Sequence, residues 1–256
     1  MSGAGAVVGA VQRGLLFVLR YAVLGVALVL GFWALPKAGQ PFTAVALLAA
    51  LNGVNLLVHE GGHYLAARCL GLRVLQWRVG MLELIARRRG FRVRWRPAAK
   101  GAPAGFVHMV PLPRVPMRKA FLVAIAAGPA ANLVAAAFAG LAGLLLPGAA
   151  AAVAFAFAVI SLFTGLANLY PMPSESNDGA LLQFWWRQRD ERAPLLAGVR
   201  LMALSIDGTP PDRLPVEDLL TLEESEPWAV ARYRAKAAQL GGDWPAARRQ
   251  WQQLID

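Results

Sequence analysis

The sequence has few of the residues that usually carry chemistry. Among 256 residues there are three histidines, one cysteine, and 15 acidic residues against 26 basic ones. The single cysteine, Cys69, excludes an intrachain disulfide. Before the tail that follows Trp186, only four acids occur: Glu60, Glu83, Glu175 and Asp178. A site outside the tail that needs carboxylates must be built from these four.

Long apolar runs dominate the chain, of which 57% is hydrophobic. Four runs have the roughly 18 residues or more that a helix needs to cross a hydrocarbon core about 30 Å thick. They cover residues 15–35, 42–70, 120–146 and 149–170. We expect an integral membrane protein, mainly α-helical, with a four-span bundle. The first run follows basic residues, so a cleaved signal peptide is the alternative. Its length and the lack of a clear Ala-x-Ala site favour a retained anchor.

The net charge of +11 is concentrated in one loop between spans. Residues 72–119 contain twelve Lys and Arg residues against one acid, Glu83, whereas the tail is nearly balanced. Basic loops stay on the cytoplasmic side, so we expect this loop and both termini to be cytoplasmic, in a bacterial cell membrane. The basic face would lie against anionic headgroups. The distribution favours a lipid bilayer as the partner and argues against nucleic acid.

Within this loop, apolar and basic residues alternate. Residues 91–96 and 74–79 show period 2, which suits strands with one wet face. Arg89 and Gly90 supply a turn between them, and residues 101–111 suit a loop or a third strand. We expect a small membrane-surface β element. A basic amphipathic patch without sheet order is the alternative.

The tail after the fourth run has its own organisation. Residues 179–206 are expected to be helical, with Trp185 and Trp186 at a membrane interface. Residues 208–215 form a linker. Two helices at 227–240 and 244–254, around Gly241-Gly242-Asp243, resemble one tetratricopeptide hairpin, which is too little for a solenoid. We expect a C-terminal helical cytoplasmic cap, for which a protein partner is one interpretation.

The second apolar run contains His-Glu-Gly-Gly-His at residues 59–63. On a helix, His59 and His63 lie one turn apart on the same face, which suits two imidazoles on one Zn²⁺ with Glu60 beside them. Ionisable groups at membrane depth are costly without partners, so they are functional candidates. A catalytic zinc needs a third ligand. Asp178 follows the prolines that end the fourth run, at the same expected depth, although it could instead be an ordinary turn residue before Gly179.

At this point the chain resembles the site-2 protease family of intramembrane zinc metalloproteases. The motifs are His59–His63, Gly128-Pro129-Ala-Ala-Asn132, and Asn168-x-x-Pro171 followed by Asp178-Gly179. The resemblance covers roughly residues 42–182. Where the family usually has Leu before the Asp-Gly pair, this chain has Asn177, and its Asn-to-Asp interval is longer than the commonest form.

The resemblance implies roles for these residues. Asp178 is the implied third ligand and Glu60 the implied base, while Asn132 and Asn168 help hold an unwound substrate backbone. Residues 101–111, including Gly105 and Phe106, look like the family's substrate-presenting loop. The two asparagines could also be interhelical hydrogen-bonding residues, and Asn52 and Asn55 could support the histidines.

These expectations give a division of the chain and a hypothesis. The divisions are 1–41 (first span and outer loop), 42–182 (protease core, spans 2–4) and 183–256 (cytoplasmic tail). The hypothesis is a zinc-dependent endopeptidase that cleaves a membrane-anchored protein near the cytoplasmic face, as in regulated intramembrane proteolysis. The alternative is a non-proteolytic membrane protein, a carrier or assembly scaffold. No inverted repeat is evident to support a carrier, and Glu60 would have no role in a structural zinc site.

Overall fold

The computed structural model describes residues 41–87, 89–97, 103–172, 177–190, 192–252 and 254, with a few residues between 14 and 30. The predicted first span therefore lies mostly outside the described residues, as does Glu175. The chain forms two compact units. The first comprises Met1–Cys69, Val74–His108 and Phe121–Arg187, and the second Leu70–Arg73, Met109–Ala120 and Gln188–Asp256.

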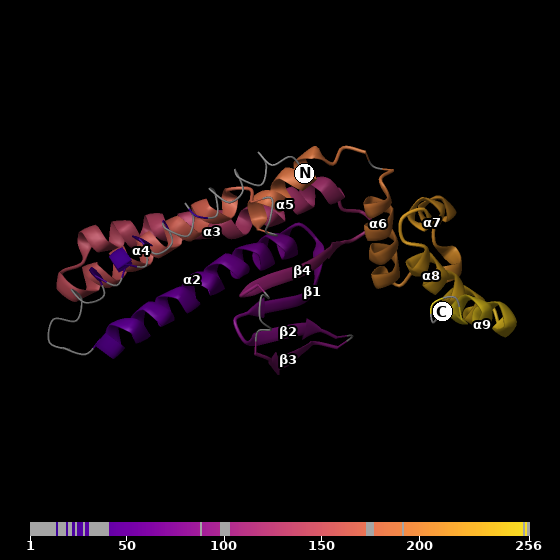
Figure 1. The fold of residues 1–256 in the computed structure, drawn as a ribbon, viewed down its shortest axis with the longest axis horizontal. Coiled ribbons are helices and arrows are strands. Elements are labelled where there is room, and N and C mark those ends of the chain that lie inside the picture. The colour runs from indigo at the N-terminus through magenta and orange to yellow at the C-terminus, as the bar shows by residue number, and fades with distance from the viewer. Residues whose placement is uncertain are drawn as a thin grey trace. The chain divides into compact units, whose positions relative to one another are not determined.

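Three long helices form the body of the first unit: α2 (Pro41–Cys69), α3 (Met117–Leu145) and α4 (Gly148–Leu169). All three are long and apolar enough to cross a membrane, which confirms that the second, third and fourth predicted runs form helices of span length. Figure 1 shows α3 and α4 running alongside α2. The chain reverses between α3 and α4 at Gly148, whose φ of +57° suits glycine.

The outer surfaces of these helices are apolar. Leu65 on α2 is 64% exposed, and Phe138 and Leu144 on α3 are 70% and 75% exposed. A soluble protein rarely leaves so many large apolar side chains uncovered. This surface suits contact with lipid, because hydrocarbon removes the cost of exposing it.

A four-stranded sheet follows α2 and has the strand order β3-β2-β1-β4 (Figure 1). Its strands are β1 (Leu72–Val79), β2 (Leu82–Ala86), β3 (Phe91–Trp95) and β4 (Gly105–Pro111). Both β1–β2 and β2–β3 pair antiparallel. The predicted β element is therefore confirmed. The turn at Gly90 joins β3 to β2, a strand that the alternation pattern did not indicate.

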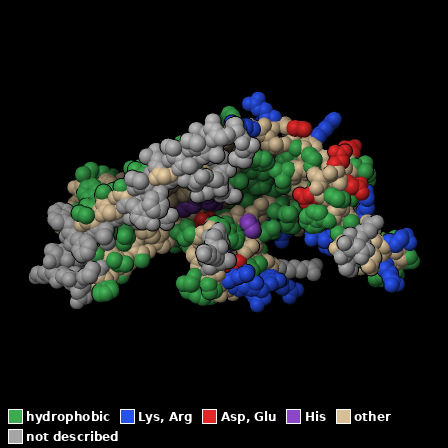
Figure 2. Space-filling model, viewed as in Figure 1, with side chains coloured by type: hydrophobic (Ala, Val, Ile, Leu, Met, Phe, Trp, Pro, Cys, Tyr) green, Lys and Arg blue, Asp and Glu red, His purple; other side chains and the backbone are tan. Residues whose placement is uncertain are grey.

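The alternation in β3 separates two kinds of surface. Phe91, Val93 and Trp95 lie on one face of the hairpin, opposite Ala86, Leu84 and Leu82 of β2. Arg92 and Arg94 project from the other face because neighbouring residues on a strand alternate. Figure 2 shows basic side chains gathered over the sheet.

After α4 the chain forms α5 (Asp178–Arg187), α6 (Pro194–Asp207), a short 3-10 helix (Pro211–Arg213), α7 (Val216–Glu223), α8 (Pro227–Leu240) and α9 (Trp244–Gln252). The expectation that residues 179–206 are helical is confirmed for α5 and α6, with a break between Arg187 and Pro194. The chain leaves helical geometry after Arg187, and a new helix begins at Pro194, where proline is favoured at a first turn. The second unit has its own core, around Leu201, Leu222 and Val230.

Candidate metal centre

His59 and His63 lie one turn apart on α2, as their spacing predicts, and both are buried. Their Nε2 atoms are 3.3 Å apart and point to a common place. Asp178, the first residue of α5, lies there too. Its Oδ2 is 3.0 Å from His59 Nε2, and its Oδ1 is 3.4 Å from His63 Nε2. One ligand atom from each of the three residues lies within 4.8 Å of the others.

Asp178 reaches α2 because Asn177 ties the start of α5 to the end of α4. The Asn177 side-chain amide donates to Tyr170 O at 2.7 Å, and its Oδ1 accepts from Ala180 N at 3.0 Å. The second bond is a helix N-cap, which satisfies a backbone donor of the first turn. The residue that departs from the family pattern therefore fixes the position of its neighbour, Asp178.

A ring contact holds the other end of α5. Trp185 stacks on Phe121 of α3 with ring centroids 4.5 Å apart, and both side chains are buried. Phe121 therefore covers Trp185, and the position of Trp185 at a membrane interface stays a prediction. Trp186 remains 63% exposed and fits that expectation.

The Nδ1 atoms of the two histidines, which face away from the ligand cluster, have different partners. His63 Nδ1 lies 2.8 Å from the backbone oxygen of Ala124 in α3. A carbonyl only accepts, so His63 carries its hydrogen on Nδ1 and presents a lone pair at Nε2. His59 Nδ1 lies 3.2 Å from the side-chain amide of Asn132, also in α3.

Glycines allow α2 and α3 to cross this closely. A Cβ on Gly62 would lie 2.5 Å from Ala127 O and 2.8 Å from the Ala131 Cβ. A Cβ on Gly128 would overlap the His63 imidazole. The first glycine sets the separation of the helices, and the second leaves room for a ligand ring between them.

Glu60 directly follows His59 on α2 and is 4% exposed. Its carboxylate packs against Gly105 of β4, where any side chain would collide with it. Within the described residues, its Oε2 has no hydrogen-bond partner. A buried carboxylate oxygen with free lone pairs beside a ligand cluster can accept a proton from water.

The donor set suits zinc. Two neutral imidazole nitrogens and one carboxylate oxygen form a three-ligand set of the type found in catalytic zinc sites, which leaves a fourth position open. The ligands are buried, and the hydrogen-bond partner of His63 directs its lone pair inward.

Comparison with known families supports this assignment. Residues 46–157 match the model of Peptidase family M50. This is the site-2 protease family. The resemblance inferred from the motifs is therefore confirmed for this part of the chain. Comparison with curated proteins and with solved structures gives no significant match. The M50 match and the three apolar helices support an integral membrane protein of a metallopeptidase family.

The M50 match includes His59, Glu60, His63 and Asn132 and ends before Asn168 and Asp178. Asn168 on α4 donates to Thr164 O of its own helix at 3.2 Å. Phe106 on β4 stacks on His108 with centroids 4.5 Å apart. Substrate contact by Asn132, Asn168, Gly105 and Phe106 stays a prediction.

No motif in the sequence indicated a role for Thr164. It accepts a 2.9 Å hydrogen bond from Asn55, which links α2 to α4 one turn before His59. Asn52 instead donates to Leu48 O of its own helix. Asn55 therefore contributes to the packing of α4 on α2 rather than to a direct contact with a histidine.

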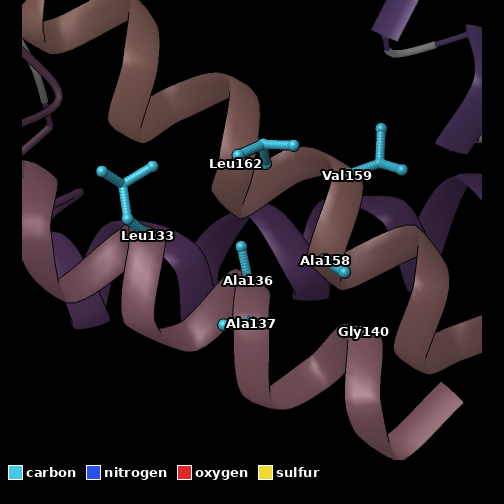
Figure 3. Close-up of a pocket in the computed structure, with 7 residues that line it drawn as sticks. All are labelled: Leu133, Ala136, Ala137, Gly140, Ala158, Val159 and Leu162. Atoms are coloured by element: carbon cyan, nitrogen blue, oxygen red, sulfur yellow. The ribbon is translucent and has the colours of Figure 1, made fainter.

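An apolar pocket of about 360 Å³ lies elsewhere, between α3 and α4 (Figure 3). Leu133, Gly140 and Leu162 are among its lining residues, and none of those residues is titratable. It lacks the groups that hydrolysis requires, so the histidine and aspartate cluster remains the candidate site.

Proposed function

We propose that the protein is an intramembrane zinc metalloendopeptidase that cleaves a membrane-anchored protein near the cytoplasmic face. The observation that carries this proposal is the meeting of His59, His63 and Asp178, with Glu60 adjacent, on a helix of membrane-span length and composition. Such groups would be costly at membrane depth without a functional reason.

In this proposal His59, His63 and Asp178 hold one Zn²⁺. When bound, the ion supplies a Lewis acid that polarises a carbonyl and makes water easier to deprotonate. Glu60 is the general base and takes a proton from the attacking water at its unpartnered Oε2. The same carboxyl then returns the proton to the leaving amine. Burial of Glu60 keeps this proton from bulk water.

The substrate must present an extended backbone, because the carbonyls of a transmembrane helix are occupied by their own hydrogen bonds. β4 is an edge strand of the sheet, and its Gly105 touches Glu60. An unwound segment that pairs with this edge would come close to the base. We propose Gly105, Phe106 and Asn168 as substrate contacts. Asn132 has no exposed surface, so it would meet a substrate only if α3 moved.

The proposed topology follows from charge. The basic loop between α2 and α3 is placed in the cytoplasm, and with it the end of α2 that carries the histidines. Four spans then leave both termini cytoplasmic and make the C-terminal helices a cytoplasmic cap. Cleavage at this depth would release the cytoplasmic part of a substrate, as regulated intramembrane proteolysis requires.

The test is cleavage of model single-span substrates by the detergent-purified full chain, beside Glu60→Gln, with zinc measured in each. Glu217→Gln, at an exposed acid of α7, is the matched control. We expect about one zinc per chain in all three proteins, and cleavage by the wild type and the control alone. Cleavage by Glu60→Gln at the wild-type rate would contradict the role of Glu60. Absence of bound zinc from the wild type would favour the carrier or scaffold.

A further inference from the structure

Asn132 is a fully buried polar residue whose amide is turned toward a predicted zinc ligand. It is 0% exposed and lies on α3, opposite α2. Its side-chain amide is 3.2 Å from His59 Nδ1. With the amide nitrogen on His59, its Oδ1 has no hydrogen-bond partner among the described residues.

The chemistry of imidazole decides which end of the amide must face His59. A neutral imidazole carries one hydrogen. If Asn132 donated to Nδ1, that hydrogen would be on Nε2, and Nε2 would have no lone pair for a metal. Turning the carboxamide by 180° exchanges its oxygen and nitrogen at unchanged shape and places Oδ1 on His59 Nδ1–H. Only this orientation leaves His59 Nε2 free to bind zinc.

We propose that Asn132 is a positioning residue that holds His59 in the tautomer required for zinc, by accepting a hydrogen bond from Nδ1–H. The inference rests on the proposed zinc site and changes the role of Asn132 from substrate contact to ligand support. His63 receives the same support from the backbone oxygen of Ala124. The two ligands on α2 are thus oriented by two acceptors on α3, of which only one is a side chain that mutation can remove.

The test measures the zinc dissociation constant of the purified full chain by competition with a chelator. Asn132→Leu keeps a similar volume but removes the acceptor. We expect zinc to bind about 10- to 100-fold more weakly, as is typical when the partner of a metal-binding histidine is lost. Asn132→Asp keeps an acceptor oxygen and is expected to stay within about threefold of the wild type, because carboxylates serve the same purpose behind zinc-binding histidines.

Asn52→Leu is the matched control, since Asn52 lies on α2 and donates to Leu48 O of its own helix. It is expected to leave zinc affinity unchanged. If Asn132 served only in packing, Asn132→Asp should bind zinc more weakly than Asn132→Leu, because a buried Asp costs more free energy than a buried Leu.

The zinc-binding measurements distinguish a failure of the Asn132 role from a failure of the proposed zinc site. Wild-type affinity in both Asn132 variants, with weakened substrate binding, would overturn the inference and restore the substrate role. Equal losses in Asn132→Leu and Asn132→Asp would also overturn it, because rescue by the acceptor would be missing. A wild-type chain that binds no zinc would overturn the proposed function itself.

Discussion

Gly61 and Gly62 are neighbours on α2, yet the structure predicts opposite results when each is replaced by alanine. A Cβ on Gly61 would meet nothing within 4 Å. A Cβ on Gly62 would lie 2.5 Å from Ala127 O and 2.8 Å from the Ala131 Cβ, both on α3. Normal contacts between such atoms are about 3.5–4.0 Å. Because one partner is backbone, α2 and α3 would have to separate by roughly 1 Å.

The expected change in the free energy of unfolding has two contributions. Both substitutions replace a helical glycine, which stabilises a helix by about 0.5–1 kcal/mol. Only Gly62→Ala adds overpacking, at about 1–3 kcal/mol. The helix contribution cancels in the difference, so Gly62→Ala should be less stable than Gly61→Ala by about 1–3 kcal/mol. The shift also moves His59 and His63 from their partners on α3, and metal sites tolerate only about 0.5 Å.

The assay is thermal unfolding of both variants in one detergent, with zinc affinity measured alongside. Gly61→Ala should match or exceed the wild type in stability and keep its zinc affinity. Gly62→Ala should unfold earlier and bind zinc at least about tenfold more weakly. Equal behaviour of the two variants would refute the helix crossing described here.

Three further predictions concern other contacts. Asn177→Ala loses both the helix cap and the bond to Tyr170 O, so it should cost about 1 kcal/mol or more and weaken zinc binding. Asn177→Asp keeps the cap oxygen but loses the amide donor, so its stability should fall between Asn177→Ala and the wild type; equal unfolding of the two variants would contradict the cap. Arg200→Met leaves the buried Asp218 carboxylate without its ion pair and should destabilise the C-terminal helices by about 2–3 kcal/mol at unchanged zinc affinity. Unchanged unfolding would contradict this. A hydrogen bond from Arg234 holds the pKa of Glu223 below its ordinary value of 4.5, so the ionised carboxylate should stabilise the folded chain above that pH and lose this effect as pH falls. The unfolding temperatures of Glu223→Gln and the wild type should therefore converge in acid. A difference between them that stays constant with pH would contradict this.

Much of the membrane architecture could be predicted from the sequence, because span length and composition are local properties. The helices α2, α3 and α4 begin and end within about three residues of the predicted runs. β2 escaped prediction because five residues carry too little alternation to stand out. The break between α5 and α6 was missed because the polar run at residues 187–192 contains no glycine or proline, and charged residues are common on exposed helix surfaces.

In the candidate site, too, some features follow from local sequence and others depend on tertiary packing. The spacing of His59 and His63 is a property of one helix and needed no tertiary information. The approach of Asp178 depended on chain order and the expected depth of α4's end. The contact between Asn132 and His59 depends on the rotation of α3 about its own axis, which side-chain packing sets and no local pattern reveals.

The proposed function depends on the binding of one zinc ion by His59, His63 and Asp178. We would examine the purified full chain by X-ray absorption at the zinc edge, with Asp178→Ala beside the wild type. We expect two imidazole nitrogens at about 2.0–2.1 Å and oxygen at about 2.0–2.2 Å from zinc, with weaker zinc binding in the variant. A sulfur ligand at about 2.3 Å, an absence of imidazole scattering, or an unchanged spectrum and affinity in Asp178→Ala would rule out this ligand set.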